Sequence, residues 1–348
     1  MDNLSHTLVG IHLARLPAFR SIGPRLAFWT GVAASNAPDV DGVLRFWSER
    51  AYIFEHRGIT HSLLAALLIA PLVAAIAGLV ARRPLHRDFL PLLGLSLAGV
   101  AVHLFFDLIT SWGTMLLLPF SHARLALPWV FVLDVVVWAI LGIPLLRTAW
   151  RRRRGGIPDS IVRRSSVATL SVLSLYIALC ALGHERARRV ALAQLPDGAE
   201  PEEVLAFPVP PGPLLWTTAV RDANQVWHRG FASVLTGGVT HAGQVATGLD
   251  DPRVQVALET ELGSTYRWFA AALYRASATE LAADGSYEVT LADLRFSGPF
   301  REEVPFQLWM EIGPDFRVRA YEFRTGRLSA EEAAAAPSPI AGDEGGAW

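Results

Sequence analysis

The chain has 348 residues, of which 52% are hydrophobic and 18% are charged, and its mean hydropathy is +0.33. It is thus more apolar and less charged than an ordinary soluble domain. The formal net charge of −1 provides no basic field, so the sequence predicts no nucleic-acid partner. A single cysteine, Cys180, excludes a disulfide framework and a cysteine-based zinc site.

The first 62 residues contain two short apolar stretches, at residues 8–16 and 26–34. Each is compatible with a helix but is shorter than the roughly 20 residues that a helix needs to cross a bilayer. We therefore expect these helices either to lie on the membrane or to pack against a helix bundle. The N-terminus lacks the basic and apolar regions of a secretory signal peptide.

Four longer apolar stretches predict membrane-spanning helices at residues 63–81, 89–110, 129–146 and 167–183. The first and the fourth contain no charged residue. The second contains His103 and Asp107, and the third contains Asp134. In lipid such segments must be helical, because their backbone polar groups can form hydrogen bonds only within the segment.

Arginines in the connecting loops predict the orientation of these spans. Three follow the first span and seven follow the third, whereas the loop after the second span contains only Arg124. By the positive-inside rule the two arginine-rich loops are cytoplasmic, and both termini lie outside. Six arginines within residues 1–62, and three just after the fourth span, argue against this orientation.

The character of the sequence changes near residue 192, after a membrane domain that we place at residues 1–185. A proline-rich linker at 207–213 opens a region with β-rich segments at 214–220, 286–291, 306–312 and 317–323 and helical segments at 254–262 and 266–274. The predicted fold is mainly α, with a multi-pass transmembrane bundle, a soluble α+β domain at 192–327 containing an antiparallel sheet, and a disordered tail at 328–348.

His103 and Asp107 lie four residues apart within the second span. On a helix that spacing places both side chains on one face. A histidine and a carboxylate are costly inside a bilayer, so they usually face a polar interior or a metal ion. The alternative interpretation is a buried His–Asp hydrogen bond that holds helices together.

Two further pairs precede the first span. Asp39 and Asp41 repel each other unless a cation or an arginine neutralises them, and an Asx turn is the alternative. His56 and His61 flank a glycine turn, with Thr60 as the expected cap of the following helix. The alternative for these histidines is that they are polar residues just above the membrane.

The predicted topology brings all these candidates, together with Asp134 near the start of the third span, to one membrane face. Imidazole and carboxylate ligands without thiolate suit zinc, manganese or iron. The number of ligands indicates more than one divalent ion. The expected metal ligands are His6, Asp39, Asp41, His56, His61, His103 and Asp107.

The motifs Pro-Asp-x-Asp at 38–41, His-Arg-Gly-x-Thr-His-Ser at 56–62 and His-x-x-x-Asp at 103–107 resemble the YdjM-type family of membrane-bound metal-dependent hydrolases. Residues 108–113 and the prolines at 119 and 128 also resemble this family, and His6 corresponds to its early histidine. The resemblance covers about the first 145 residues. The arrangement of the ligands is also similar to that of zinc-dependent phospholipase C.

The resemblance and the ligand set imply a bacterial inner-membrane enzyme that hydrolyses a phosphoester of a lipid or a small envelope metabolite through a metal-activated hydroxide. Asp39 or Asp41 would be the base. Arg57 would hold a phosphate oxygen, or would instead lie near lipid headgroups. Asp134 would orient a ligand histidine. Both the site and the C-terminal domain would face outward.

Two other functional classes remain open. The first is a non-enzymatic membrane protein with a structural metal site or a polar helix lock and a partner-binding C-terminal domain. The second is a metal transporter, which would need polar residues deeper in several spans. We expect no metal ligand from the C-terminal domain, because His228 and His241 lack a nearby acidic partner at ligand spacing.

Overall fold

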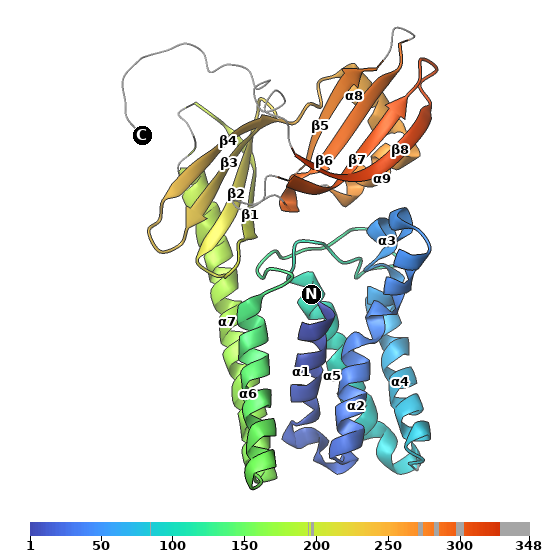
Figure 1. Cartoon of the computed structure of the whole chain (residues 1–348), viewed down its shortest axis with the longest axis vertical. Helices are drawn as coiled ribbons and strands as arrows, with labels where there is room; N and C mark the ends of the chain where they lie inside the picture. Colours follow the sequence, from blue (N-terminus) through green and yellow to red (C-terminus); the bar gives the residue numbers. More distant parts are fainter. Residues whose placement is uncertain are drawn as a thin grey trace. The chain divides into compact units, whose positions relative to one another are not determined.

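Helices connected by 3₁₀ turns form the N-terminal part of the chain (Figure 1). This computed structural model describes residues 1–83, 85–193, 195, 198–270, 274–281, 285–296 and 303–327, so the predicted tail lies outside the described residues. The elements are α1 (Asn3–Ala14), η1 (Pro17–Ile22), α2 (Pro24–Asn36), η2 (Ala37–Phe46), α3 (Glu49–Glu55), η3 (Ile59–His61), α4 (Leu63–Val80), α5 (Leu85–Leu108), α6 (Val135–Arg154) and α7 (Asp159–Ala193).

Two compact units divide the chain. The first contains Met1–Arg186 and Phe207–Trp216, and the second contains Ala187–Ala206 and Thr217–Trp348. Residues 207–213, which their composition predicts to be a linker, contain the end of strand β1 (Pro201–Pro208) and the turn to strand β2 (Leu215–Asp222), and they belong with the first unit. The functional division of the chain into 1–185 and 192–327 stays a prediction.

Three helices are long and apolar enough to cross a membrane, and they coincide with three predicted spans. Their candidate segments are Leu63–Val80, Asp88–Leu108 and Asp159–Ala193. Helix α4 leaves most of its leucines exposed, as a helix that faces lipid must. Its cap is Ser62, whose side chain accepts a hydrogen bond from the Ala65 N–H, so the expected cap at Thr60 is wrong.

The third predicted span differs from the structure at its start. Residues 129–134 are not helical, because the N–H groups of Trp129 and Val130 donate to the Ile109 carbonyl instead. Helix α6 begins only after Asp134, whose carboxylate caps its first turn, and it ends in four consecutive arginines. It is not among the candidate spans of the described residues, so the third predicted span, at 129–146, stays a prediction.

Helices α1 and α2 pack within the bundle rather than lying apart from it (Figure 1). Their crossing depends on two glycines: a Cβ at Gly10 would lie 2.5 Å from the Gly31 carbonyl oxygen, and one at Gly31 would lie 2.5 Å from that of Gly10. Small residues at such a contact let helix backbones approach closely. Close packing thus holds the N-terminus of α1 beside the C-terminal halves of α2 and α5.

The second unit contains two four-stranded antiparallel sheets rather than the single sheet that the sequence predicts. One sheet has the order β1 (Pro201–Pro208), β2 (Leu215–Asp222), β3 (Val226–Ser233), β4 (Val239–Ala246). The other has the order β5 (Tyr274–Glu280), β6 (Tyr287–Asp293), β7 (Glu303–Ile312), β8 (Val318–Arg327). Between them in sequence lie α8 (Pro252–Glu259) and α9 (Glu261–Phe269), so the second predicted helix ends before Tyr274, which starts a strand.

Candidate metal centre

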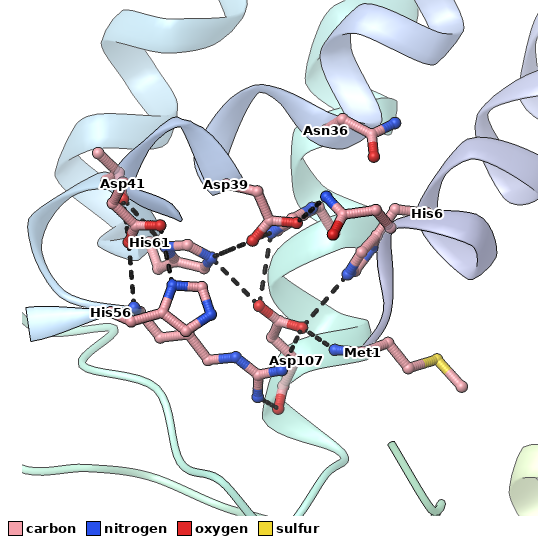
Figure 2. A network of polar contacts seen from close by, with 12 residues as sticks. Met1, His6, Asn36, Asp39, Asp41, His56, His61 and Asp107 are labelled. Atoms are coloured by element: carbon pink, nitrogen blue, oxygen red, sulfur yellow. Dashed lines mark hydrogen bonds and ion pairs between the residues drawn. The ribbon is translucent and has the colours of Figure 1, made fainter. Parts of the chain in front are cut away.

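One end of the first unit gathers the predicted ligands from four parts of the chain (Figure 2). Helix α1 contributes His6, and η2 follows α2 directly and contributes two aspartates. The turn between α3 and α4 contributes two histidines, and the last turn of α5 contributes His103 and Asp107. The structure thus brings together, at one end of the bundle, side chains that are up to 101 residues apart, from His6 to Asp107.

The inner group consists of Asp39, His61, His103 and Asp107, whose ligand atoms all lie within 4.8 Å of one another. The Nε2 atom of His61 lies 3.1 Å from that of His103, 3.2 Å from Asp107 Oδ2 and 3.4 Å from Asp39 Oδ1. His103 Nε2 lies 3.4 Å from Asp107 Oδ2 and 3.6 Å from Asp39 Oδ1. Ligands about 2.1 Å from an ion at the centre of a tetrahedron are about 3.4 Å apart, so these spacings fit one tetrahedral divalent ion.

The hydrogen bonds that the other ring nitrogens of His61 and His103 form also favour a divalent ion in the inner group. His103 Nδ1 lies 2.7 Å from the Ser35 carbonyl oxygen, which can only accept, so Nδ1 carries the proton and Nε2 has a free lone pair. His61 Nδ1 lies 3.2 Å from Asp41 Oδ2 and is held in the same tautomer. Two lone pairs that face each other repel unless a cation or a proton lies between them. Such outer partners are typical of metal-binding histidines.

The outer group consists of Asp39, Asp41 and His56, and it shares Asp39 with the inner group. His56 Nδ1 lies 2.9 Å from Asp41 Oδ1. The side chains of Asp39, Asp41 and His56 are 13%, 8% and 14% exposed, whereas those of His61, His103 and Asp107 are fully buried. The inner group could therefore hold an ion among four mostly buried side chains, and the outer group could hold one among three partly exposed side chains.

Asp41 has four polar partners in the centre. Its Oδ2 accepts from the Arg57 backbone N–H at 3.0 Å and from the Thr60 hydroxyl at 2.9 Å, in addition to its contacts with both histidines. Burial alone would raise its pKa, but these contacts hold the pKa well below the usual range of an aspartate. Asp41 is therefore a weak base that orients His56 and His61.

His6 lies beside the inner group without a hydrogen-bond partner for either ring nitrogen among the described residues. Its ring stacks on His103 with centroids 3.9 Å apart, and its Nε2 lies 3.3 Å from Asp107 Oδ1. The amino group of Met1 contacts the same carboxylate oxygen. Burial lowers the pKa of His6 to about 4, so its ring is neutral, which is the form that binds a metal.

Arg57 is buried and contacts the centre through Asp107. Its NH2 lies 3.1 Å from Asp107 Oδ1, and its NH1 donates to the Thr110 hydroxyl at 2.8 Å and to the Asp107 carbonyl at 3.2 Å. Its backbone is left-handed, with φ of 62°, and a Cβ on the following Gly58 would lie 2.6 Å from the Glu55 carbonyl oxygen. This tight turn points the guanidinium inward, towards Asp107 and Thr110.

The charges of the centre require a counter-ion. Three carboxylates converge, and the Arg57 guanidinium and the Met1 amino group both contact one of them, Asp107. Burial alone would lower the pKa of His61, but hydrogen bonds to Asp107, Asp39 and Asp41 outweigh it and raise the pKa to about 10. Without a cation, a proton on His61 therefore fills the role that a divalent ion would fill in the inner group.

The structure places Asp134 in a different set of contacts. Its Oδ1 accepts from the N–H groups of Val136 and Val137, and its Oδ2 accepts from the Tyr176 hydroxyl at 2.7 Å. This carboxylate joins α6 to α7 and does not contact a ligand histidine in the described structure. No feature of the sequence distinguishes this role from the one that we expected.

The prediction that His228 lacks an acidic partner is wrong. Its Nε2 lies 2.9 Å from Asp222 Oδ2 across the β2–β3 turn, six residues upstream. The Asp222 carboxylate also accepts from the N–H groups of Asn224 and Val226, so the pair stabilises a turn. Among the described residues, the groups that could hold a metal ion lie in the first unit.

The sequence did not indicate several groups that support the centre. The Ser35 carbonyl is a backbone group and leaves no sequence signal, and it reaches His103 because Gly99 lets α5 approach α2. Thr110 lies in the segment 108–113 that resembles the family, which is the signal by which it could have been found. Asn3 donates to Asp39 Oδ2 at 2.9 Å.

Apolar spans and a buried His/Asp cluster that could hold a metal ion define a membrane protein with a candidate metal centre. The chain belongs to the family described as "YdjM inner membrane protein", whose profile matches residues 1–187. It is also similar to "Uncharacterized protein YfhP" of Bacillus subtilis (strain 168), with 31% identity over 160 residues, which are 41% of this chain and 48% of the relative. The chain thus spans about half the length of that relative. No solved structure matches the chain significantly.

The family assignment confirms the resemblance that the sequence motifs carry. All candidate ligands lie within the matched region, so the centre belongs to the part of the chain that the family defines. The descriptions of the family and of the relative name no reaction.

Proposed function

We propose that this protein is a membrane-bound, metal-dependent hydrolase of phosphoesters, which reacts at the outer group. The observation that carries the proposal is the pair of positions that share Asp39. A position with four protein ligands is closed, as in structural sites, whereas one with three protein ligands leaves room for water and substrate. The partial exposure of Asp39 and His56 supports access to this second position.

The ligand chemistry supports zinc, with manganese or iron as alternatives, and the two groups support two ions. Divalent ions at such a site polarise a phosphoryl oxygen and lower the pKa of water. In the hydrolysis, a bond forms between the water oxygen and phosphorus, the bond from phosphorus to the alcohol oxygen breaks, and the alcohol leaves with a proton.

The residues of the chain then have distinct tasks. Asp39 belongs to both groups and would connect the two ions, and Asp41 would complete the outer group while it contacts both histidines. Arg57 balances the charge of Asp107, because its guanidinium is already engaged and almost fully buried. Asp134 stabilises the junction of α6 and α7.

The surface of η2 supports a substrate at the membrane surface. A 3₁₀ helix has three residues per turn, so Val40, Val43 and Phe46 form one row. They are 65%, 63% and 91% exposed, while Asp41, on another row, is turned inward to the histidines. Helix α4 begins two residues after His61, so this apolar row lies next to the end of a membrane span. Apolar residues at that depth insert into the lipid interface, which favours a lipid phosphoester over a freely soluble one.

The positions of the arginines support an inner-membrane protein whose centre and C-terminal domain are extracytoplasmic. Because α1 and α2 form an antiparallel pair, Arg15, Arg20 and Arg25 lie at the end of the bundle opposite the metal centre (Figure 1). Arg152 and Arg163 lie at the same end, where they line one cavity with Arg15 and Arg20. Three of the six N-terminal arginines that opposed the predicted orientation therefore agree with it.

The test is a measurement of metal content and phosphoesterase activity on the full chain in detergent. We expect about two divalent ions per chain and hydrolysis of bis(p-nitrophenyl) phosphate that a chelator abolishes. His56→Ala should lose one ion and the activity while it keeps the inner ion. Replacement of His122, a histidine outside both groups, serves as the control.

A specific observation also favours a second candidate function, a structural metal site. Three of the four side chains of the inner group, His61, His103 and Asp107, are fully buried, which is typical of structural zinc. In that case the protein would contain one ion, His56→Ala would not change the metal content, and no phosphoester would be hydrolysed. These results would replace the hydrolase proposal.

A further inference from the structure

A second polar site lies in the first unit, at the end opposite the metal centre. A cavity of about 120 Å³ there is lined by four arginines from separate elements. Arg15 follows α1, Arg20 lies on η1, Arg152 on the last turn of α6 and Arg163 on the first turns of α7. We call this site the arginine cavity.

The arginine cavity has an excess of positive charge. Asp159 is the single acid among its lining residues, and it pairs with Arg152 at 3.0 Å. Arg163 donates to the Leu16 carbonyl, and no carboxylate of the described residues pairs with Arg15, Arg20 or Arg163. Arg15 and Arg152 line the same cavity, and burial together with the charge of Arg152 lowers the pKa of Arg15. A bound anion would relieve the repulsion between these like charges.

The start of helix α2 adds further donors for an anion. Gly23 and Pro24 line the cavity, and the N-cap residue Gly23 provides no side chain to bond the N–H groups of the first turn. Free N–H groups and the helix dipole make such a terminus attractive to phosphate. The arginine side chains and the helix terminus are therefore two independent features that favour the same ligand chemistry.

The remaining walls of the cavity are apolar. Ile11, Phe19, Ala27 and Phe28 line it beside the arginines. Nearby at the end of α6, the exposed Trp150 stacks under Arg154, with 4.4 Å between the guanidinium carbon and the ring centroid. Aromatic and basic residues together mark the level of the lipid headgroups. An apolar wall beside a phosphate site at this level fits the glycerol and first carbons of a lipid better than a free ion.

We propose that the arginine cavity binds the phosphate of an anionic phospholipid from the leaflet opposite the metal centre. Arg15 and Arg163 contact the phosphate directly, Arg20 lies at the exposed rim, and the apolar wall receives the start of the acyl chains. Basic pockets between membrane helices commonly recognise anionic headgroups in this way. The site does not depend on the proposed hydrolase activity.

The test uses native mass spectrometry of the full chain, freed of lipid in detergent and then titrated with phosphatidylglycerol. Phosphatidylcholine with the same acyl chains and sodium phosphate are the comparison ligands. We expect phosphatidylglycerol to bind roughly tenfold more tightly than phosphatidylcholine, and Arg15→Gln/Arg163→Gln to remove this preference. Arg151→Gln/Arg153→Gln removes the same charge from exposed positions outside the cavity and should keep the preference.

Three results would overturn the proposal. The unmodified protein could show no preference for phosphatidylglycerol. Both double variants could lose it equally, which would indicate general surface charge. Sodium phosphate could bind as tightly as the lipid, which would indicate a soluble anion. If Arg15→Gln/Arg163→Gln does not fold, Arg20→Gln, at an exposed position, should still weaken phosphatidylglycerol binding severalfold, and an unchanged affinity would equally refute the site.

Discussion

Replacing His103 with alanine removes one of the four ligand atoms of the inner group and leaves the Ser35 carbonyl without its donor. Loss of an outer hydrogen-bond partner of a metal ligand alone weakens metal binding about 10–100-fold. We therefore expect loss of the ligand itself to weaken it by at least about 100-fold. At a free-ion concentration of about 100 times the dissociation constant of the unmodified protein, metal binding stabilises that protein by about 2.7 kcal/mol. At the same concentration, metal binding stabilises His103→Ala by only about 0.4 kcal/mol.

The assay combines elemental analysis of the dialysed protein with thermal unfolding in detergent, with and without a chelator. The chelator should lower the Tm of the unmodified protein but hardly change that of His103→Ala. His228→Ala is the control, because His228 pairs with Asp222 in the second unit and is not a candidate ligand. A full metal content in His103→Ala, or an equal loss in His228→Ala, would refute the metal assignment and leave a polar helix lock in its place.

Three further predictions follow from the same structure. In the metal-free protein the pKa of His61 is raised to about 10, so the protonated ring stabilises the folded state. This stabilisation is complete below about pH 6.5 and is lost as the pH rises through about 10. Chelated protein should therefore lose thermal stability in that range more steeply than metal-loaded protein, and parallel curves would contradict the assignment. Val43→Ser/Phe46→Ser should lower the rate of hydrolysis of bilayer-embedded phosphatidylglycerol severalfold and leave the rate on a soluble phosphoester unchanged. An equal change in the two rates would exclude a role of these side chains in lipid contact. A reporter fused after residue 155 should be cytoplasmic and one near residue 340 extracytoplasmic, and the reverse pattern would move the centre to the other face.

The three candidate spans were predictable because long apolar segments without charges have few alternatives in a membrane. Residues 63–81 coincide with α4 to within one residue. The start of α6 was not predictable in this way, because hydropathy does not show that Trp129 and Val130 donate hydrogen bonds to the end of α5. In the C-terminal region, Tyr274 was predicted as the end of a helix because it continues an amphipathic helical pattern, whereas in the structure it is the first residue of β5.

Within the candidate site, the residue types and their order along the chain indicated the ligands but not their tasks. Asp39 and Asp41 are two residues apart and equivalent in sequence. In the structure, Asp39 is shared between two positions, whereas Asp41 orients histidines. Arg57 was expected at a phosphate or at a headgroup, yet its left-handed backbone turns it towards Asp107.

The sequence by itself determined that apolar helices would cross a membrane and that histidines and aspartates would lie at their ends, because hydropathy and the positions of ionisable residues act locally. Only the tertiary structure decided which nitrogen of each ring faces the centre, which carboxylate is shared, and that four arginines surround one cavity. The first two of these properties depend on distances of 3 to 4 Å between segments far apart in the chain. Such distances are set by how closely the helices pack at Gly10, Gly31 and Gly99, which no local pattern specifies.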